Sequence, residues 1–404
     1  MSLDTPSRPA DGTLPASALA ELGERPFGVY VHVPFCATRC GYCDFNTYTA
    51  QELPGGVDRG SYAASAISEL ALARGILGDG APQVSTVFFG GGTPTLLAPG
   101  QLASILRGID QTFGLAPGAE VTTEANPESV DPASFATLRE AGFTRISLGM
   151  QSAVPHVLTT LDRTHTPGRP QAAVAEARAA GFEHVSLDLI YGTPGESDDD
   201  WRASLDAALS AEPDHVSAYS LTIEPGTRMG ALVRRGKLPE PDEDALADRY
   251  AIADEALAAA GLHWYEISNW SRDDAARCAH NVNYWRGGDW WGIGPGAHSH
   301  VGGVRWWNVL HPSAYARALA SGGSPRADRE LLDDETRRFE RVMLETRLRE
   351  GLDTALLRPA GRAVAERAVR DGLAEAAPLA ADGRLVLTRR GRLLADALVR
   401  DLVD

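Results

Sequence analysis

Three of the four cysteines in this chain of 404 residues stand close together, at Cys36, Cys40 and Cys43. Thiolates are the protein ligands of iron–sulfur clusters, and three of them leave one iron of a [4Fe–4S] cluster without a protein ligand. The amino and carboxylate groups of S-adenosylmethionine (SAM) could chelate that iron, with the sulfonium placed for one-electron cleavage to a 5′-deoxyadenosyl radical. The cofactors would supply this chemistry and the protein would position them. The spacing therefore predicts a cluster with an open iron.

Other uses of these cysteines are less consistent with the surrounding residues. Positions i, i+4 and i+7 also share one helical face, where buried cysteine is common, but Pro34 and Gly41 disfavour a helix here. Structural zinc wants a fourth ligand, commonly from paired C-x2-C knuckles, which are missing nearby. Disulfides are disfavoured because residues 1–25 contain no apolar core of a secretory signal, so we expect a reducing cytoplasm. Ligation of a cluster remains the favoured interpretation.

The segment from about residue 28 to 270 must position this loop. It alternates short β-branched or aromatic runs with Ala- and Leu-rich runs of helical period, which predicts six βα units around a parallel sheet. Six units rather than eight indicate, by analogy with closed barrels, an incomplete TIM-like (βα)6 barrel with an open side. The predicted strands are Val29–Val33, Val84–Phe89, Glu120–Glu124, Arg145–Leu148, Val185–Ile190 and Val216–Leu221, and the predicted helices are 61–79, 99–113, 132–141, 168–180, 198–210 and 243–260.

Chemistry in parallel α/β folds sits at the carboxyl ends of the strands. The cysteine loop follows the first predicted strand, and Gly90 to Gly92 end the second, where missing side chains would let the backbone approach a ligand. Glu124, Gln151 and Asp188 end the next three strands. Each of them could instead be an ordinary turn glycine or a solvated polar residue. Together they converge on one rim, which favours a binding site.

The C-x3-C-x2-C run resembles the signature of the radical SAM superfamily. Four further runs, Tyr30–Cys36, Gly90–Pro94, Ser147–Ser152 and Asp188–Gly192, look like its coproporphyrinogen III oxidase-like branch, and the likeness spans roughly residues 27 to 400. It implies that Tyr42 contacts the adenine of SAM and that Arg163 pairs with its carboxylate. The full set of SAM contacts implied by the resemblance is Tyr30, Tyr42, Gly91, Gly92, Thr93, Glu124, Gln151, Arg163 and Asp188.

Two features separate members of this branch. The oxidases carry a further cysteine two residues after the third ligand, where this chain has Phe45. The run Cys43–Asn46 and the run His280–Trp285, an HNxxYW pattern, instead resemble the HemW group of haem chaperones. A neutral imidazole is a natural axial ligand of haem iron, so the resemblance makes His280 the candidate haem ligand, although a hydrogen-bonded structural histidine is the plain alternative. Cys278 is expected to be a buried or half-buried thiol, and His298 could touch SAM or haem.

Four regions are expected: a mobile tail at 1–25, the radical SAM barrel at 26–270, a segment at 271–330 that closes the barrel, and a C-terminal α+β domain at 331–404. Residues 264–310 hold seven of the eight tryptophans, a composition unlike the βα units. The last region is expected to resemble a winged helix, with helices at Glu335–Leu348 and Ala363–Asp371, a hairpin turning at Asp382–Gly383 and a final helix.

The formal net charge of −16 disfavours nucleic acid as a partner, and therefore RNA modification as a function. The chain shows no run of about 18 apolar residues that could span a membrane, so any membrane contact would be peripheral. The resemblance thus implies a cytoplasmic haem chaperone that holds a [4Fe–4S] cluster, SAM and haem, and delivers haem to an apoprotein such as a respiratory enzyme. The alternative is an oxygen-independent coproporphyrinogen III oxidase-like enzyme of porphyrin biosynthesis. No catalytic residue is assigned.

Overall fold

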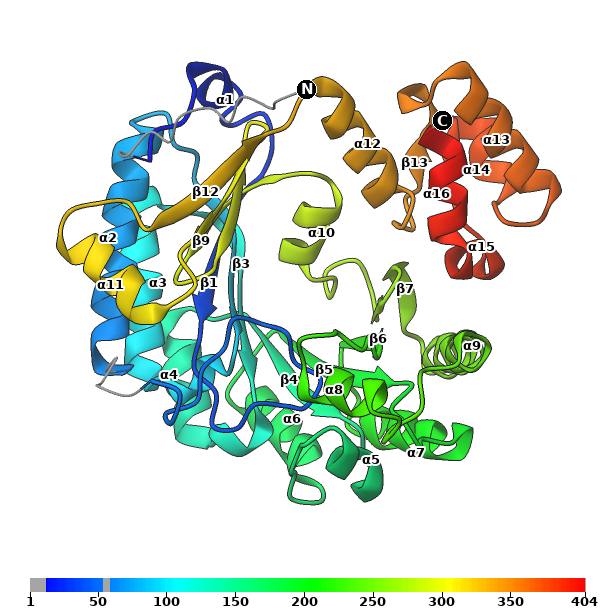
Figure 1. The fold of residues 1–404 in the computed structure, drawn as a ribbon, viewed down its shortest axis with the longest axis horizontal. Coiled ribbons are helices and arrows are strands. Elements are labelled where there is room, and N and C mark those ends of the chain that lie inside the picture. Colours follow the sequence, from blue (N-terminus) through cyan, green and yellow to red (C-terminus); the bar gives the residue numbers. More distant parts are fainter. Residues whose placement is uncertain (1–11, 54–58, 404) are drawn as a thin grey trace.

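The computed structural model describes residues 12–53 and 59–403, and one large sheet organises them (Figure 1). Within that part of the chain the sheet has twelve strands, in the order β12-β11-β10-β9-β1-β2-β3-β4-β5-β6-β8-β7. Its ends do not meet, so it is an open sheet and not a closed barrel. The middle consists of the six predicted parallel strands, which are confirmed as β1 (Phe27–Val33), β2 (Val84–Gly91), β3 (Leu115–Ala125), β4 (Arg145–Gln151), β5 (His184–Tyr191) and β6 (His215–Ser220).

Helices cover the outer face of this sheet (Figure 1). Local signals explain where they begin and end: Ser197 and Asp200 form a capping box at the start of α7, and Asp131 caps the N-terminus of α4. All six helices predicted in the βα units are confirmed, and two short helices, α5 (Pro155–Thr160) and α8 (Arg228–Arg234), were not predicted. The six are α2 (Arg59–Leu77), α3 (Pro99–Phe113), α4 (Pro132–Ala141), α6 (Arg169–Ala179), α7 (Asp198–Leu209) and α9 (Glu243–Ala259).

Short strands that the sequence did not predict extend the sheet at both edges. Beside β1 lies β9 (Asp289–Ile293), which is parallel to it, followed by the antiparallel strands β10 (His298–Val301), β11 (Val304–Asn308) and β12 (Arg326–Leu331). Beside β6 lies β8 (Asn269–Ser271), which is antiparallel to it. The edge strand β7 (His263–Glu266) is in turn antiparallel to β8. The tryptophan-rich segment therefore supplies sheet edges, together with α10 (Ala279–Trp285) and α11 (Pro312–Ala320).

The N-terminal part differs from the predicted mobile tail. Residues 1–11 lie outside the described residues, but 12–25 contain helix α1 (Ala16–Ala20) and pack on the sheet through Leu14 and Ala18. Glu21 receives hydrogen bonds from both terminal nitrogens of Arg337, at 2.9 and 2.6 Å. Two apolar anchors and a bidentate ion pair hold this segment in place, a tertiary effect that its Pro- and Ala-rich composition does not reveal.

The C-terminal region has its own apolar core, separate from that of the sheet. The predicted helices are confirmed as α12 (Asp334–Glu345) and α13 (Pro359–Arg370), and the chain ends with α15 (Arg389–Leu393) and α16 (Ala395–Val403). The predicted hairpin turn at Asp382–Gly383 is wrong: Asp382 ends helix α14 (Ala376–Asp382), and Gly383 is its left-handed cap with φ +64°. The two-stranded sheet pairs β14 (Arg384–Leu385) with the distant β13 (Leu352–Asp353).

A buried ion pair fastens this region to α9. Arg392 donates to both carboxylate oxygens of Asp254, at 3.0 and 2.7 Å, and its guanidinium lies 4.4 Å from the centre of the Trp264 ring. Replacing Arg392 by Met would leave the carboxylate without its partner, so we expect the protein to lose about 3–5 kcal/mol of stability in urea unfolding. The exposed pair Arg389–Glu255 is the matched control, because Arg389→Met should cost no more than about 1 kcal/mol. Equal unfolding midpoints for the two variants would contradict this interlock.

Across the described ranges, no helix is both long and apolar enough to cross a membrane.

Candidate functional site

The cysteine loop leaves the carboxyl end of β1 and folds back on itself. The amide of Cys36 donates to the carbonyl of Tyr48 (3.0 Å), and the amide of Tyr48 donates to that of Pro34 (2.7 Å), so the two ends of the loop are paired. Between them the chain has no regular helix, as Pro34 and Gly41 predicted. All three cysteines are free thiols; Cys36 is buried and the other two are partly exposed.

Asn46 holds the far half of this loop against the edge of the sheet. Its side-chain amide donates to the carbonyls of Pro295 (3.0 Å) and Leu310 (2.8 Å), while its side-chain oxygen accepts from the Tyr48 hydroxyl (3.1 Å). The ring of His32, on β1, hydrogen-bonds to the backbone carbonyl of Asn46 at 2.9 Å. Sequence reasoning quoted Asn46 as part of a motif but gave it no role; this clamp is the role.

The thiols lie close enough to affect one another's protonation. Burial is the main cause, and negative charge on Cys43 and Cys40 a smaller one, that raises the pKa of Cys36 to about 11. Thiolates placed together therefore repel unless a cation joins them, and iron deprotonates the thiols it binds. Within the described residues, no three His, Cys, Asp or Glu side chains meet closely enough to hold a single ion. Three free thiols in one loop are the donor type that holds a four-iron cluster, so the donor set fits a cluster.

Gly92 lets the end of β2 approach this loop. A Cβ atom at this position would come within 2.4 Å of the Phe35 carbonyl oxygen and 3.0 Å of the Cys36 sulfur, so any side chain would displace the loop. The amide of Thr93 donates to the same carbonyl at 2.7 Å. Two of the predicted SAM contacts, Gly92 and Thr93, are thus brought next to the first cysteine.

Two carboxyl groups face the interior from the ends of β3 and β5. Glu124 accepts from the amide of Gly91 at 3.2 Å, and Asp188 accepts from the Ser147 hydroxyl at 2.9 Å. Burial, together with the negative charge of Asp188, raises the pKa of Glu124 to about 8. Burial also raises the pKa of Asp188. A paired, desolvated set of carboxyls favours a cationic ligand, and SAM carries a sulfonium group.

Arg163 connects the cysteine loop to the end of β4. One terminal nitrogen lies 3.6 Å from the sulfur of Cys40, and the other donates to the Gly149 carbonyl at 3.0 Å and to the side chain of Gln151. Gln151 has φ +58°, a conformation uncommon for a residue other than glycine. The Nε atom of Arg163 is buried and finds no partner among the described residues, so the guanidinium keeps one donor for a ligand.

The two predicted tyrosines have different surroundings. Tyr42 packs on a small apolar cluster that includes Leu161 and Met229. The Tyr30 hydroxyl forms a hydrogen bond of 3.0 Å with His32, and its ring stacks 6.4 Å from that of His280. The structure therefore joins the cysteines, Gly92, Thr93 and Arg163. Glu124 and Asp188 border this group, because Glu124 accepts from Gly91 and the charge of Arg163 lowers the pKa of Asp188 against the effect of burial. Tyr30 lies between Glu124 and the layer beside α10.

His280 is a buried member of that layer, with 1% of its surface exposed. Its Nδ1 atom is 2.9 Å from the Thr86 hydroxyl and its Nε2 atom is 2.8 Å from the Tyr284 hydroxyl. Burial lowers its pKa to about 3, so the ring is neutral. Both ring nitrogens are occupied in this conformation, which matches the structural alternative and leaves neither free for iron.

Two other residues singled out in the sequence lie apart from the cysteines. Cys278 is buried, as expected, with its sulfur 3.6 Å from a carboxylate oxygen of Glu120. His298 is exposed and stacks on Trp307.

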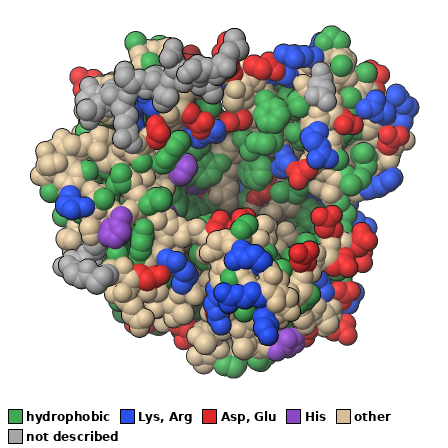
Figure 2. Space-filling model, in the orientation of Figure 1, with side chains coloured by type: hydrophobic (Ala, Val, Ile, Leu, Met, Phe, Trp, Pro, Cys, Tyr) green, Lys and Arg blue, Asp and Glu red, His purple; other side chains and the backbone are tan. Residues whose placement is uncertain are grey.

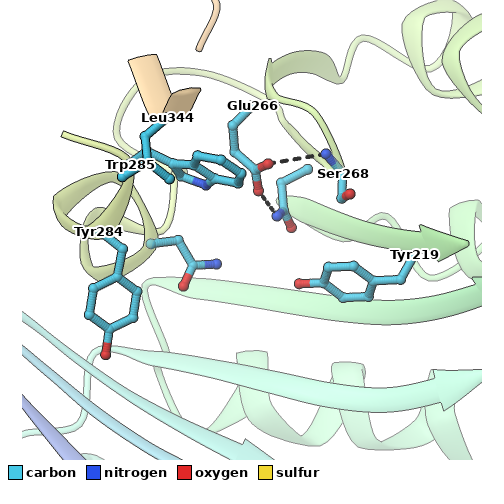
Figure 3. A pocket seen from close by; sticks show the side chains of 8 residues that line it. Tyr219, Glu266, Ser268, Tyr284, Trp285 and Leu344 are labelled. Atoms are coloured by element: carbon cyan, nitrogen blue, oxygen red, sulfur yellow. Dashed lines mark hydrogen bonds between the residues drawn. The ribbon is translucent and has the colours of Figure 1, made fainter. Parts of the chain in front are cut away.

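Three other residues of the HNxxYW run, Asn281, Tyr284 and Trp285, line a pocket of about 280 Å³ (Figure 3). Figure 3 shows Tyr219 and Tyr284 on one side of it and Trp285 beside Glu266 on the other. Burial raises the pKa of Glu266 to about 7, and the buried side-chain oxygen of Asn269 has no partner in the described part of the chain. The lining consists of Tyr219, Glu266, Ser268, Asn269, Asn281, Tyr284, Trp285 and Leu344. A hollow with hydrophobic and acidic side chains on its rim opens near the centre of the face in Figure 2.

Comparison with known proteins agrees with this arrangement. A model of the radical SAM superfamily matches residues 30–208, which span the cysteine loop and the first five strands. In the solved structures, coproporphyrinogen III oxidase (HemN) from Escherichia coli, described as a radical SAM enzyme, aligns with a TM-score of 0.78 and 22% identity over 95% of this chain and 92% of that one. The fold and the loop are thus those of a radical SAM protein, a class that uses a [4Fe–4S] cluster and SAM.

Full-length relatives narrow the assignment. Heme chaperone HemW of Mycobacterium tuberculosis (strain H37Rv) is 56% identical over 385 residues, which cover 95% of this chain and 97% of that protein. Heme chaperone HemW of Bacillus subtilis (strain 168) is 35% identical over 326 residues, which cover 80% of this chain and 84% of that protein. The chain belongs to the HemW family.

Proposed function

We propose that this protein is a haem chaperone that binds haem and passes it to apoproteins in the cytoplasm, respiratory enzymes among them. The observation that supports this function most strongly is the 56% identity to a HemW protein across nearly the whole of both chains. The alternative, a coproporphyrinogen III oxidase-like enzyme, is not favoured, because Phe45 stands where the oxidases carry a cysteine and its side chain is 61% exposed.

Cys36, Cys40 and Cys43 would hold the cluster, and the remaining iron would take SAM. When bound, the two cofactors supply one-electron chemistry. Arg163 would orient the carboxylate of SAM with its free donor, since it already lies against Cys40. Glu124 and Asp188 would attract the positive charge of the SAM sulfonium. Gly91, Gly92 and Thr93 would give SAM access to the backbone of β2.

For haem, the pocket beside α10 is the candidate site. Tyr284 and Trp285 offer aromatic surface to one edge of a flat macrocycle, and Asn269 offers an unused acceptor. His280 would ligate iron only after releasing Tyr284 or Thr86, so in the described conformation its contribution is to hold Tyr284 in place.

A haem titration of the cluster-loaded protein under anaerobic conditions tests this function. We expect a haem absorption band with saturable binding, and about fivefold to tenfold weaker binding in Trp285→Leu, because an aromatic contact of roughly 1 kcal/mol is lost together with buried area. Leu393→Ala, which truncates an exposed apolar side chain of α15 outside the pocket, is the control and should bind haem normally.

A parallel incubation separates carrier from enzyme. The same protein is given coproporphyrinogen III, SAM and a reductant, and the product is analysed for protoporphyrinogen IX. We expect none. Turnover would overturn the chaperone proposal, whereas unchanged haem binding in Trp285→Leu would overturn only the placement of haem in this pocket.

A further inference from the structure

Thr47 occupies an unusual position in the cysteine loop. Its side chain is 1% exposed, and its hydroxyl has no regular hydrogen-bond partner among the residues described. A buried hydroxyl without a partner costs roughly 1–3 kcal/mol. Such a group is retained where a partner arrives later, for example a ligand or a metal group.

The backbone around Thr47 fixes where this hydroxyl lies. Its amide donates to the Phe45 carbonyl at 2.7 Å in a tight turn, and its own carbonyl accepts from the guanidinium of Arg39. The next residue, Tyr48, forms an isolated parallel β-bridge with Phe35. This pairing places Thr47 beside the start of the cysteine run. The turn and the bridge leave the side chain no freedom to reach solvent.

The Thr47 hydroxyl affects two of the three thiols of the loop. The amide of Cys36 donates to the carbonyl of Tyr48, the residue after Thr47, at 3.0 Å. Burial raises the pKa of Cys36 and Cys43, and the nearby Thr47 hydroxyl lowers both without completing a hydrogen bond to either sulfur. The backbone of Phe45 acts on Cys43 in the same direction. The loop therefore turns back after Cys43 and presents two donors to its sulfurs.

We propose that the Thr47 hydroxyl is a positioning residue that donates a hydrogen bond to sulfur at the cluster site and thereby sets the reduction potential of the cluster. The inference rests on the proposed cluster ligands. Reduction adds one electron to the cluster, and a donor aimed at sulfur stabilises the more negative reduced form. A thiolate or cluster sulfur is also a stronger acceptor than a neutral thiol, so the orphaned donor gains its partner when the cluster is present.

The test is a redox titration of the reconstituted protein with dithionite, followed by the EPR signal of the reduced cluster. Thr47→Val keeps the shape and removes the donor. We expect its potential to be more negative than that of the unmodified protein, by up to about tenfold in the reduction equilibrium, or about 59 mV for one electron. Thr47→Ser restores the hydroxyl and should restore the potential.

Thr49→Val is the matched control, because the Thr49 hydroxyl in the same loop bonds to Glu52 and not to sulfur. It should leave the potential unchanged. If Thr47→Val retains no cluster, Thr47→Ala replaces it in the titration. A potential equal to that of the unmodified protein in the variant that holds a full cluster would overturn this proposal, and it would leave the cluster ligands and the haem function untouched. Loss of the cluster in every variant, including Thr47→Ser, would also overturn it, since the requirement would then be structural.

Discussion

Replacing Cys40 by alanine is expected to abolish the iron–sulfur spectrum of the reconstituted protein. Three thiolates hold three irons of the cluster and leave the fourth open. The loss of one thiolate therefore leaves a second iron without a protein ligand and makes the cluster labile. Cys40 suits this test better than Cys36, because it is only partly buried and its truncation leaves a smaller cavity. The measurement is iron and sulfide content together with the visible absorption of the anaerobically reconstituted variant.

Cys278→Ala serves as the control for this experiment. Its thiol is buried beside Glu120, away from the loop, so its removal should leave four irons per chain. An intact four-iron signal in Cys40→Ala would remove Cys40 from the ligand set. A signal lost in both variants would indicate that the fold, and not ligation, had failed, and the unfolding midpoints of the two variants would show this directly.

Replacing Glu124 by glutamine is expected to weaken the binding of SAM in a manner that depends on pH. The pKa of this carboxyl is about 8 in the empty site, so it is mostly protonated at pH 6 and mostly ionised above pH 8.5. A cationic ligand binds the ionised form better. We therefore expect the unmodified protein to bind SAM about tenfold tighter than Glu124→Gln at pH 8.5, the value of one charge-assisted hydrogen bond, and equally well at pH 6.

The unmodified protein must be compared with Glu124→Gln at each pH, because the α-amino group of SAM titrates in the same pH range as Glu124. Its contribution is common to both and cancels in the ratio of their dissociation constants. Glu183→Gln is the control, since Glu183 is exposed and pairs with Arg139. A ratio that stays constant between pH 6 and pH 8.5 would contradict the assignment of Glu124 to the charge of SAM.

The parallel core of the fold could be predicted because each of its elements has a local signal. Each strand from β1 to β6 contains a short run of β-branched, aromatic or other apolar residues, and α3 and α4 begin at a proline. The edge strands β7 to β12 are three to six residues long and lie in mixed aromatic and glycine-rich sequence. One local signal for them was overlooked: Gly302–Gly303 stand between Val301 and Val304 with φ +54° and +79°, which is a two-residue hairpin turn.

The ambiguous signal at Asp382–Gly383 shows the opposite error. The same dipeptide can turn a hairpin or end a helix, because both use a left-handed glycine. In this chain the dipeptide ends a helix, because the amide of Gly383 donates to the carbonyls of Leu379 and Pro378 in the last turn of α14.

At the site, residue type and strand position predicted candidate ligands but not the residues that support them. The cysteines and the carboxyls at the ends of β3 and β5 follow from the sequence. The contact of Arg163 with Cys40, the clamp of Asn46 and the buried hydroxyl of Thr47 depend on chain segments that are distant in sequence or on the path of the loop. His280 shows the converse, because a motif match indicated ligation and the contacts of both ring nitrogens indicate packing.

The clamp at Asn46 has a consequence for the order of events during synthesis. Its two acceptors, the carbonyls of Pro295 and Leu310, follow it by 249 and 264 residues. At roughly 5–20 residues per second, Asn46 is synthesised about 13–53 seconds before Leu310. During that interval the three thiols are present without the wall against which their loop is held. Iron and sulfide therefore reach a finished loop only near the end of translation or after it, when the last strands have joined the first.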